Sequence, residues 1–101
     1  DFAGAAAYVE RERAPDDAVA SLQVAGLAFR LYAPRWSAVD SVAELDAVRQ
    51  SAPRTWAVAA FPKYGPPPPF GDAIAKNFEM VKRLPGTLSN GDIVIYRSRR
   101  H

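Results

Sequence analysis

Apolar and polar positions repeat along the chain with two different periods, and the change between them marks the expected elements. Apolar residues at spacings of three and four predict a helix over 2–13. Residues 18–24 alternate between apolar and polar, which is typical of a strand. Shorter apolar groups predict a helix over 26–32, which should end before Pro34, and a short strand over 36–40.

The middle of the chain carries the clearest local signals. Ser41 and Glu44 have the spacing of a capping box, in which the serine hydroxyl accepts from the Glu44 amide and the glutamate reaches back to the Ser41 amide. A helix is therefore expected to follow, and it should end before Pro53. The next run, TWAVAAF at 55–61, has no polar alternation after its threonine, which predicts a strand buried on both faces, as in a parallel sheet.

A proline-rich loop over 61–71 follows this strand and holds five of the nine prolines in the chain. Because proline fixes φ, the run predicts a stiff, extended segment. After the loop, Asp72 is expected to cap a helix that stops before Pro85 and turns three apolar residues to one face, namely Ile74, Phe78 and Val81.

The last predicted element is a hairpin over 87–97. Asn90-Gly91 is a strong signal for a type I′ turn, and IVIY at 93–96 is typical of a buried strand.

Helices that alternate with strands predict crossover connections, a parallel sheet and helices on both of its faces. The expected fold class is therefore α/β, with a single domain over 1–101. We expect a three-layer α/β/α sandwich whose sheet is mostly parallel and ends in an antiparallel hairpin edge. The core should contain Trp56, Val58, Ile93 and Ile95.

The composition of the chain excludes several classes of partner and of active site. The net charge is only +2, and no basic stripe with interleaved aromatic residues is visible, so nucleic acid is not an expected partner. The chain has no cysteine, and its one histidine is the terminal His101, so neither a nucleophile–histidine pair nor a metal-ligand cluster is expected. No apolar run is long enough to span a membrane. We therefore expect no catalytic residue, no metal site and no cofactor.

Three weaker motifs have simple structural interpretations. The acidic pair Asp16-Asp17 precedes a strand rather than following one, which does not fit a phosphorylatable receiver domain and favours a turn. Gly26 stands alone after the first strand, so the spaced glycines of a nucleotide-binding loop are missing. Lys63-x-x-Pro66-x-x-Pro69 matches a polyproline ligand pattern that is short and unspecific.

Open parallel sheets bind ligands at the carboxyl ends of their strands. The polar residues expected at that edge are Gln23, Asp40, Lys63 and Tyr64, and the stiff proline loop is expected to hold Phe70 outward beside the last two. These five residues are the candidate binding residues, and each is also consistent with an ordinary solvated loop position.

The two ends of the chain carry a family resemblance. The chain opens with Asp1-Phe-x-x-Ala-Ala-x-Tyr-Val9 and Ala14-Pro-Asp-Asp17, and it closes with Leu84-Pro-Gly-Thr-Leu-x-x-Gly-Asp-Ile-x-x-Tyr-Arg97. This combination resembles the soluble carboxyl-terminal extracytoplasmic domain of bacterial GT-C membrane glycosyltransferases, the class that includes dolichyl-phosphate-mannose protein mannosyltransferases. The order of elements agrees over nearly the whole chain.

The resemblance implies an ancillary domain on the periplasmic side of the bacterial inner membrane, tethered by upstream transmembrane helices. Its parent enzyme would transfer a sugar from a polyprenyl-phosphate donor to an extracytoplasmic acceptor. The implied partners are the membrane-embedded part of that enzyme and the acceptor, and no residue here corresponds to the catalytic carboxylate of the family. A first residue other than methionine agrees with the expectation of a fragment. The alternative is an independent small α/β module that binds a ligand or regulates another protein.

Overall fold

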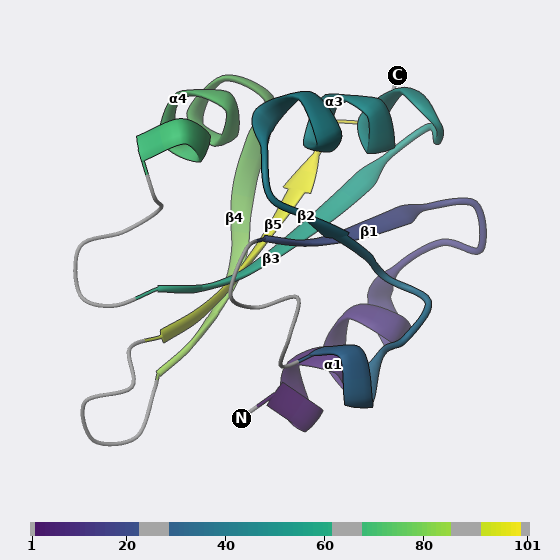
Figure 1. Cartoon of the computed structure of the whole chain (residues 1–101). Coiled ribbons are helices and arrows are strands. Elements are labelled where there is room, and N and C mark those ends of the chain that lie inside the picture. The colour runs from purple at the N-terminus through teal and green to yellow at the C-terminus, as the bar shows by residue number, and fades with distance from the viewer. Residues whose placement is uncertain (1, 23–28, 62–67, 86–91, 100–101) are drawn as a thin grey trace.

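The computed structural model describes residues 2–22, 29–61, 68–85 and 92–99 (Figure 1). Its centre is a five-stranded sheet with the strand order β2-β1-β3-β5-β4. The strands are β1 (Ala18–Leu22), β2 (Ser37–Val39), β3 (Thr55–Phe61), β4 (Phe78–Leu84) and β5 (Asp92–Ser98). The helices are α1 (Phe2–Glu12), α3 (Val42–Gln50) and α4 (Pro68–Asn77), and residues 29–32 form a further helical turn.

The sheet is mixed. β1 pairs in parallel with β2 and with β3, whereas β5 pairs antiparallel with both β3 and β4. The α/β fold class is thus confirmed, together with parallel strands in the first half and an antiparallel pair at the carboxyl end. β3 occupies the middle of the sheet, as its unbroken apolar sequence predicts.

Two hydrophobic clusters form the core. One contains residues of α1 with residues of β1, β3 and β5, and the other contains residues of α3 and α4 with residues of all five strands. Figure 1 shows α1 on one side of the sheet and α3 and α4 on the other. β3 contributes to both clusters because successive side chains of a strand point to opposite faces: Trp56 and Val58 join the α1 cluster, and Ala57 and Ala59 join the other.

Truncating Ile95 to alanine should lower the free energy of unfolding by about 2–5 kcal/mol, because a fully buried side chain of β5 would leave a cavity in the α1 cluster. Urea titration followed by circular dichroism measures this change. Met80→Ala is a control on the neighbouring strand, where the side chain is exposed, and it should shift stability by no more than about 0.5 kcal/mol. An unchanged midpoint for Ile95→Ala would contradict the placement of β5.

Most predicted elements are confirmed. The predicted helix over 2–13 contains α1, and the described part of the predicted helix over 26–32 is helical. The predicted strands at 18–24, 36–40 and 55–61 contain β1, β2 and β3. The four predicted core residues, Trp56, Val58, Ile93 and Ile95, are all buried.

The capping box before α3 forms with one difference. The Glu44 amide donates to Ser41 Oγ over 3.1 Å, as expected. The Glu44 carboxylate, however, accepts from the amide of Asp40 at 2.9 Å rather than from that of Ser41. Both exchanges satisfy backbone donors at the start of the helix, where no intrahelical acceptor exists.

The prediction of one helix from Asp72 to Pro85 is wrong in its second half, because 78–84 is the strand β4. Apolar residues at 78, 81 and 84 have a helical spacing, but Phe78 packs in the cluster under α3 and α4, and a register shift follows between Met80 and Lys82. Val81 has no cross-strand partner at this bulge, so Val81 and Leu84 pack against the same cluster although they are three residues apart. The first arm of the terminal hairpin is therefore β4, and the predicted Asn90-Gly91 turn lies outside the described residues.

The predicted extended loop over 61–71 is also wrong in part. α4 begins at Pro68, four residues before the expected cap at Asp72. Proline is tolerated in the first turn of a helix because the N–H it lacks would have no intrahelical acceptor there.

Candidate functional site

A cavity of about 350 Å³ opens between the carboxyl end of α1, the start of β1 and residues 32–37. We call it the Glu10 pocket. Its polar and aromatic lining consists of Glu10, Arg13, Asp17, Tyr32, Arg35, Trp36 and Ser37.

The wall formed by 32–37 is fixed by local hydrogen bonds and by aromatic packing. The Ala33 amide donates to the Phe29 carbonyl at 2.7 Å, and the Trp36 amide donates to the Ala33 carbonyl at 3.1 Å. The rings of Phe29 and Trp36 lie 4.9 Å apart, and Phe2 of α1 meets Phe29 edge to face at 5.2 Å. These contacts hold the indole of Trp36 against α1.

Glu10 is the fixed carboxylate of the pocket. Its Oε2 accepts from the indole N–H of Trp36 at 2.7 Å, and its Oε1 accepts from Nε of Arg13 at 3.0 Å. The hydrogen bond from Trp36 lowers the pKa of Glu10, and that from Arg13 adds to the effect, with the charges of Arg13 and Arg35, against the opposing effect of burial. Glu10 is therefore charged at neutral pH, so it can accept hydrogen bonds, and its lowered pKa makes it a poor general base.

Arg13 connects the Glu10 carboxylate to the backbone of the turn at 14–17. Besides its bond to Glu10, its Nη1 donates to the carbonyl oxygen of Asp17 at 3.0 Å and to that of Ala14 at 3.4 Å. The guanidinium therefore ties the end of α1 to the turn that leads into β1, and this turn forms the inner wall of the pocket.

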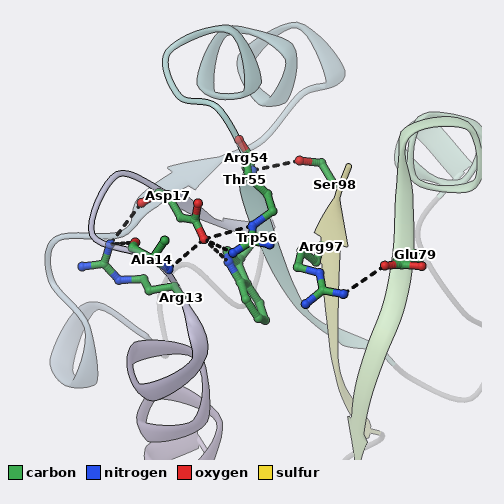
Figure 2. Close-up of polar contacts among 9 residues, drawn as sticks. All are labelled: Arg13, Ala14, Asp17, Arg54, Thr55, Trp56, Glu79, Arg97 and Ser98. Atoms are coloured by element: carbon green, nitrogen blue, oxygen red, sulfur yellow. Dashed lines mark hydrogen bonds and ion pairs between the residues drawn. The ribbon is translucent and has the colours of Figure 1, made fainter. Parts of the chain in front are cut away.

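Asp17 is a buried acceptor behind that wall, and Figure 2 shows the donors that converge on it. Its Oδ2 accepts from Nη2 and Nε of Arg54 at 2.9 and 3.1 Å, from the Trp56 indole at 2.9 Å and from the Ala14 amide at 2.9 Å. Burial alone would raise the pKa of Asp17, but the hydrogen bonds from Arg54, Trp56 and Ala14 and the charge of Arg54 together lower it.

Two guanidinium groups lie near the Trp56 ring, since the central carbon of Arg54 is 5.9 Å and that of Arg97 is 5.6 Å from its centroid. Arg97 also donates to Glu79 at 3.1 Å, and the Thr55 amide donates to Ser98 Oγ at 2.8 Å (Figure 2). These contacts join β3, β4 and β5 around the same ring.

The Glu10 pocket does not lie at the predicted edge. It contacts Ala18, Val19 and Ser37, which begin β1 and β2, so it sits at the amino ends of these parallel strands. Of the candidate residues, Asp40 is exposed just after β2. Gln23, Lys63 and Tyr64 lie outside the described residues.

Phe70 contradicts its expected position. The proline loop was expected to hold its ring outward, but the side chain is fully buried in the cluster under α4. The reason is the early start of α4, because Phe70 becomes a residue of the first helical turn and faces the sheet.

Glu10 and Asp17 were not predicted as site residues from the sequence, although the two tryptophans could have indicated that such acceptors exist. A buried indole N–H usually finds an acceptor. Here Trp36 donates to Glu10 and Trp56 donates to Asp17, and both acceptors are carboxylates. Asp17 is consequently more than a turn residue, although it does stand in the predicted turn before β1.

The Glu10 pocket presents its two carboxylates as hydrogen-bond acceptors. Its ordered carboxylates are held by arginine and indole donors, and no three histidine, cysteine or acidic residues within the described ranges gather as metal ligands would. No helix within those ranges is long and apolar enough to cross a membrane.

Comparison with known proteins adds nothing to these observations, because no family model, curated protein or solved structure matches the chain.

Proposed function

We propose that the chain is an ancillary, non-catalytic domain of a bacterial GT-C membrane glycosyltransferase, held on the periplasmic side of the inner membrane. The membrane-embedded part of that enzyme transfers a sugar from a polyprenyl-phosphate donor to an extracytoplasmic acceptor. The domain packs against that part and borders the path of the acceptor.

The observation that supports this proposal is the structural role of the residues that carry the resemblance. Ala5, Ala6 and Val9 from the opening segment share one cluster with Ile93 of the closing segment. Asp17 from the opening segment accepts the hydrogen bonds that tie the turn to β3. Packing and buried hydrogen bonds thus account for these positions without any catalytic role, as an ancillary domain requires.

The finer description of the fold belongs to the same proposal. α1 on one side of the sheet, with α3 and α4 on the other, favours a three-layer α/β/α sandwich (Figure 1). β4 is antiparallel to β5, which is antiparallel to β3, so β4 runs in the same direction as β1, β2 and β3. By direction, the sheet is then mostly parallel, with β5 reversed.

The isolated chain should show no glycosyl transfer when it is purified and supplied with a polyprenyl-phosphate sugar and an acceptor peptide, because the two carboxylates of its pocket have lowered pKa values and are poor general acids and bases. Radiolabel transfer measures this, with the full-length enzyme as the positive control. Transfer by the isolated chain would contradict a non-catalytic role. A coding sequence without membrane-spanning helices upstream would contradict the proposed parent enzyme.

The alternative function is an independent small α/β module that binds a ligand or regulates a partner. The Glu10 pocket favours it, since a volume of about 350 Å³ is within the range of small-molecule sites. The upstream coding sequence distinguishes the two proposals, because membrane-spanning helices encoded there would favour the glycosyltransferase and their absence would favour the independent module.

A further inference from the structure

The Glu10 pocket combines features that folding alone does not require. Its volume of about 350 Å³ suits a small molecule, and its lining brings together charged, polar and aromatic groups. Tyr32 is part of this lining but is 54% exposed, so its ring contributes little to the core. These features point to a ligand, and the chemistry of the walls restricts its class.

Both carboxylates that line the pocket are paired with guanidinium groups. Glu10 pairs with Arg13, Asp17 pairs with Arg54, and Arg35 adds a positive charge that is exposed to solvent. A phosphate or another strong anion would face the Glu10 carboxylate, and a strong cation would face two guanidinium groups. This pairing leaves neither carboxylate in need of a counter-ion, which favours a ligand without net charge.

The hydrogen bonds that Glu10 already accepts favour a neutral ligand over a zwitterion with an ammonium group. Each carboxylate oxygen already accepts one hydrogen bond, from Trp36 or from Arg13, and an ionised carboxylate offers about four acceptor positions in total. The remaining capacity suits one or two hydroxyl groups. An ammonium group carries three donors and loses strong hydration on binding, so two positions of an already neutralised carboxylate would compensate it poorly.

The aromatic and donor groups complete the pattern. Tyr32 lines the pocket with an aromatic side chain that is partly exposed, and such a ring has apolar faces and a polar end. Arg35 is exposed beside it and supplies hydrogen-bond donors. A ligand that fits has one apolar face and a rim of hydroxyl groups that both donate and accept.

We propose that the Glu10 pocket binds a neutral polyhydroxylated ring, the size of a single sugar unit, with one face on Tyr32 and its hydroxyls on Glu10 and Arg35. This site is additional to the proposed function and does not depend on it, because it is a property of the isolated chain.

The two tryptophan indoles provide the test. In a nitrogen-15 correlation spectrum the N–H of Trp36, which lines the pocket, should shift as methyl glucoside or methyl mannoside is added at millimolar concentration. The N–H of Trp56, which does not line the pocket, should shift much less. Glycine methyl ester, glycine and inorganic phosphate, added in the same way, represent a cation, a zwitterion and an anion.

Tyr32→Ala should weaken glycoside binding about tenfold, because the stacking face is lost. Leu31→Ala is the matched control, since Leu31 is the adjacent residue, is 85% exposed and does not line the pocket, and this variant should bind like the wild type. Glu10→Gln should also weaken binding about tenfold through the loss of a charged acceptor. If Glu10→Gln fails to fold, glycoside binding by Tyr32→Ala still tests the site.

Absence of a Trp36 shift with either glycoside in the folded wild type would overturn the proposal. A stronger response to phosphate, glycine or its ester would overturn the ligand class, and undiminished glycoside binding in Tyr32→Ala would overturn the site. None of these outcomes bears on the parent enzyme, which is tested by the coding sequence and by the transfer assay.

Discussion

Replacing Asp17 with alanine should lower the free energy of unfolding by about 3–5 kcal/mol, the usual cost of removing one partner from a buried ion pair. The side chain of Asp17 is fully buried, and its Oδ2 accepts from Arg54, Trp56 and Ala14. Its removal leaves the Trp56 indole, itself 1% exposed, without this acceptor. Chemical denaturation followed by tryptophan fluorescence measures the loss.

Two further variants locate the origin of that loss. Asp17→Asn keeps the shape and one acceptor oxygen but removes the charge, so it should cost less than alanine and still destabilise. Asp16→Ala removes the adjacent, exposed carboxylate and should have a much smaller effect. Equal stability of Asp17→Ala and the wild type would contradict the role of Asp17 as a buried acceptor.

The same carboxylate predicts how stability depends on pH. Because the pKa of Asp17 is lower in the folded state than in the unfolded chain, its contribution is fully present above the unfolded value of about 3.9. It is lost as the pH falls from there through the folded pKa. The wild type and Asp17→Asn should therefore differ most near neutral pH, and the difference should shrink below about pH 4.

Sequence patterns predicted the elements that depend on local interactions. The cap at Ser41 and Glu44 acts within four residues, and the run over 55–61 needs only a sheet on both sides to be buried. By contrast, β4 depends on its pairing with β5, and the bulge after Met80 allows Val81 and Leu84 to pack against one cluster although they are three residues apart, as in a helix. A local pattern cannot reveal a preference that another strand determines.

The candidate site could not be predicted from the sequence either, because its contacts join residues that are far apart along the chain. Trp36 meets Glu10 across 26 positions of sequence, and Asp17 meets Arg54 and Trp56 across 37 and 39. The sequence does indicate that two buried indoles need acceptors, but it does not indicate which of the eleven acidic residues supply them. The predicted edge followed a rule for open parallel sheets, whereas this pocket is formed by the segment at 32–37, which packs beside α1.

Replacing Phe70 with alanine should lower the free energy of unfolding by about 3–5 kcal/mol, although the sequence placed this residue in an exposed loop. Phe70 is fully buried in the first turn of α4, and it shares a cluster with Ile74 of the same helix and Leu45 of α3. Its ring therefore joins the proline-rich segment to the core, and an alanine would leave a cavity between α4 and the sheet. Thermal unfolding should show a midpoint at least about 10 °C below that of the wild type.

Gly71→Ala is the matched control in the same helical turn. A Cβ at this position meets nothing within 4 Å, and alanine is favoured over glycine in a helix by about 1 kcal/mol, so the variant should be as stable as the wild type or more stable. Opposite effects at adjacent positions would place the two residues on the buried and open sides of α4. If Phe70→Ala were as stable as Gly71→Ala, the ring would not be in the core, and the original expectation of an outward-facing aromatic residue at this loop would be restored.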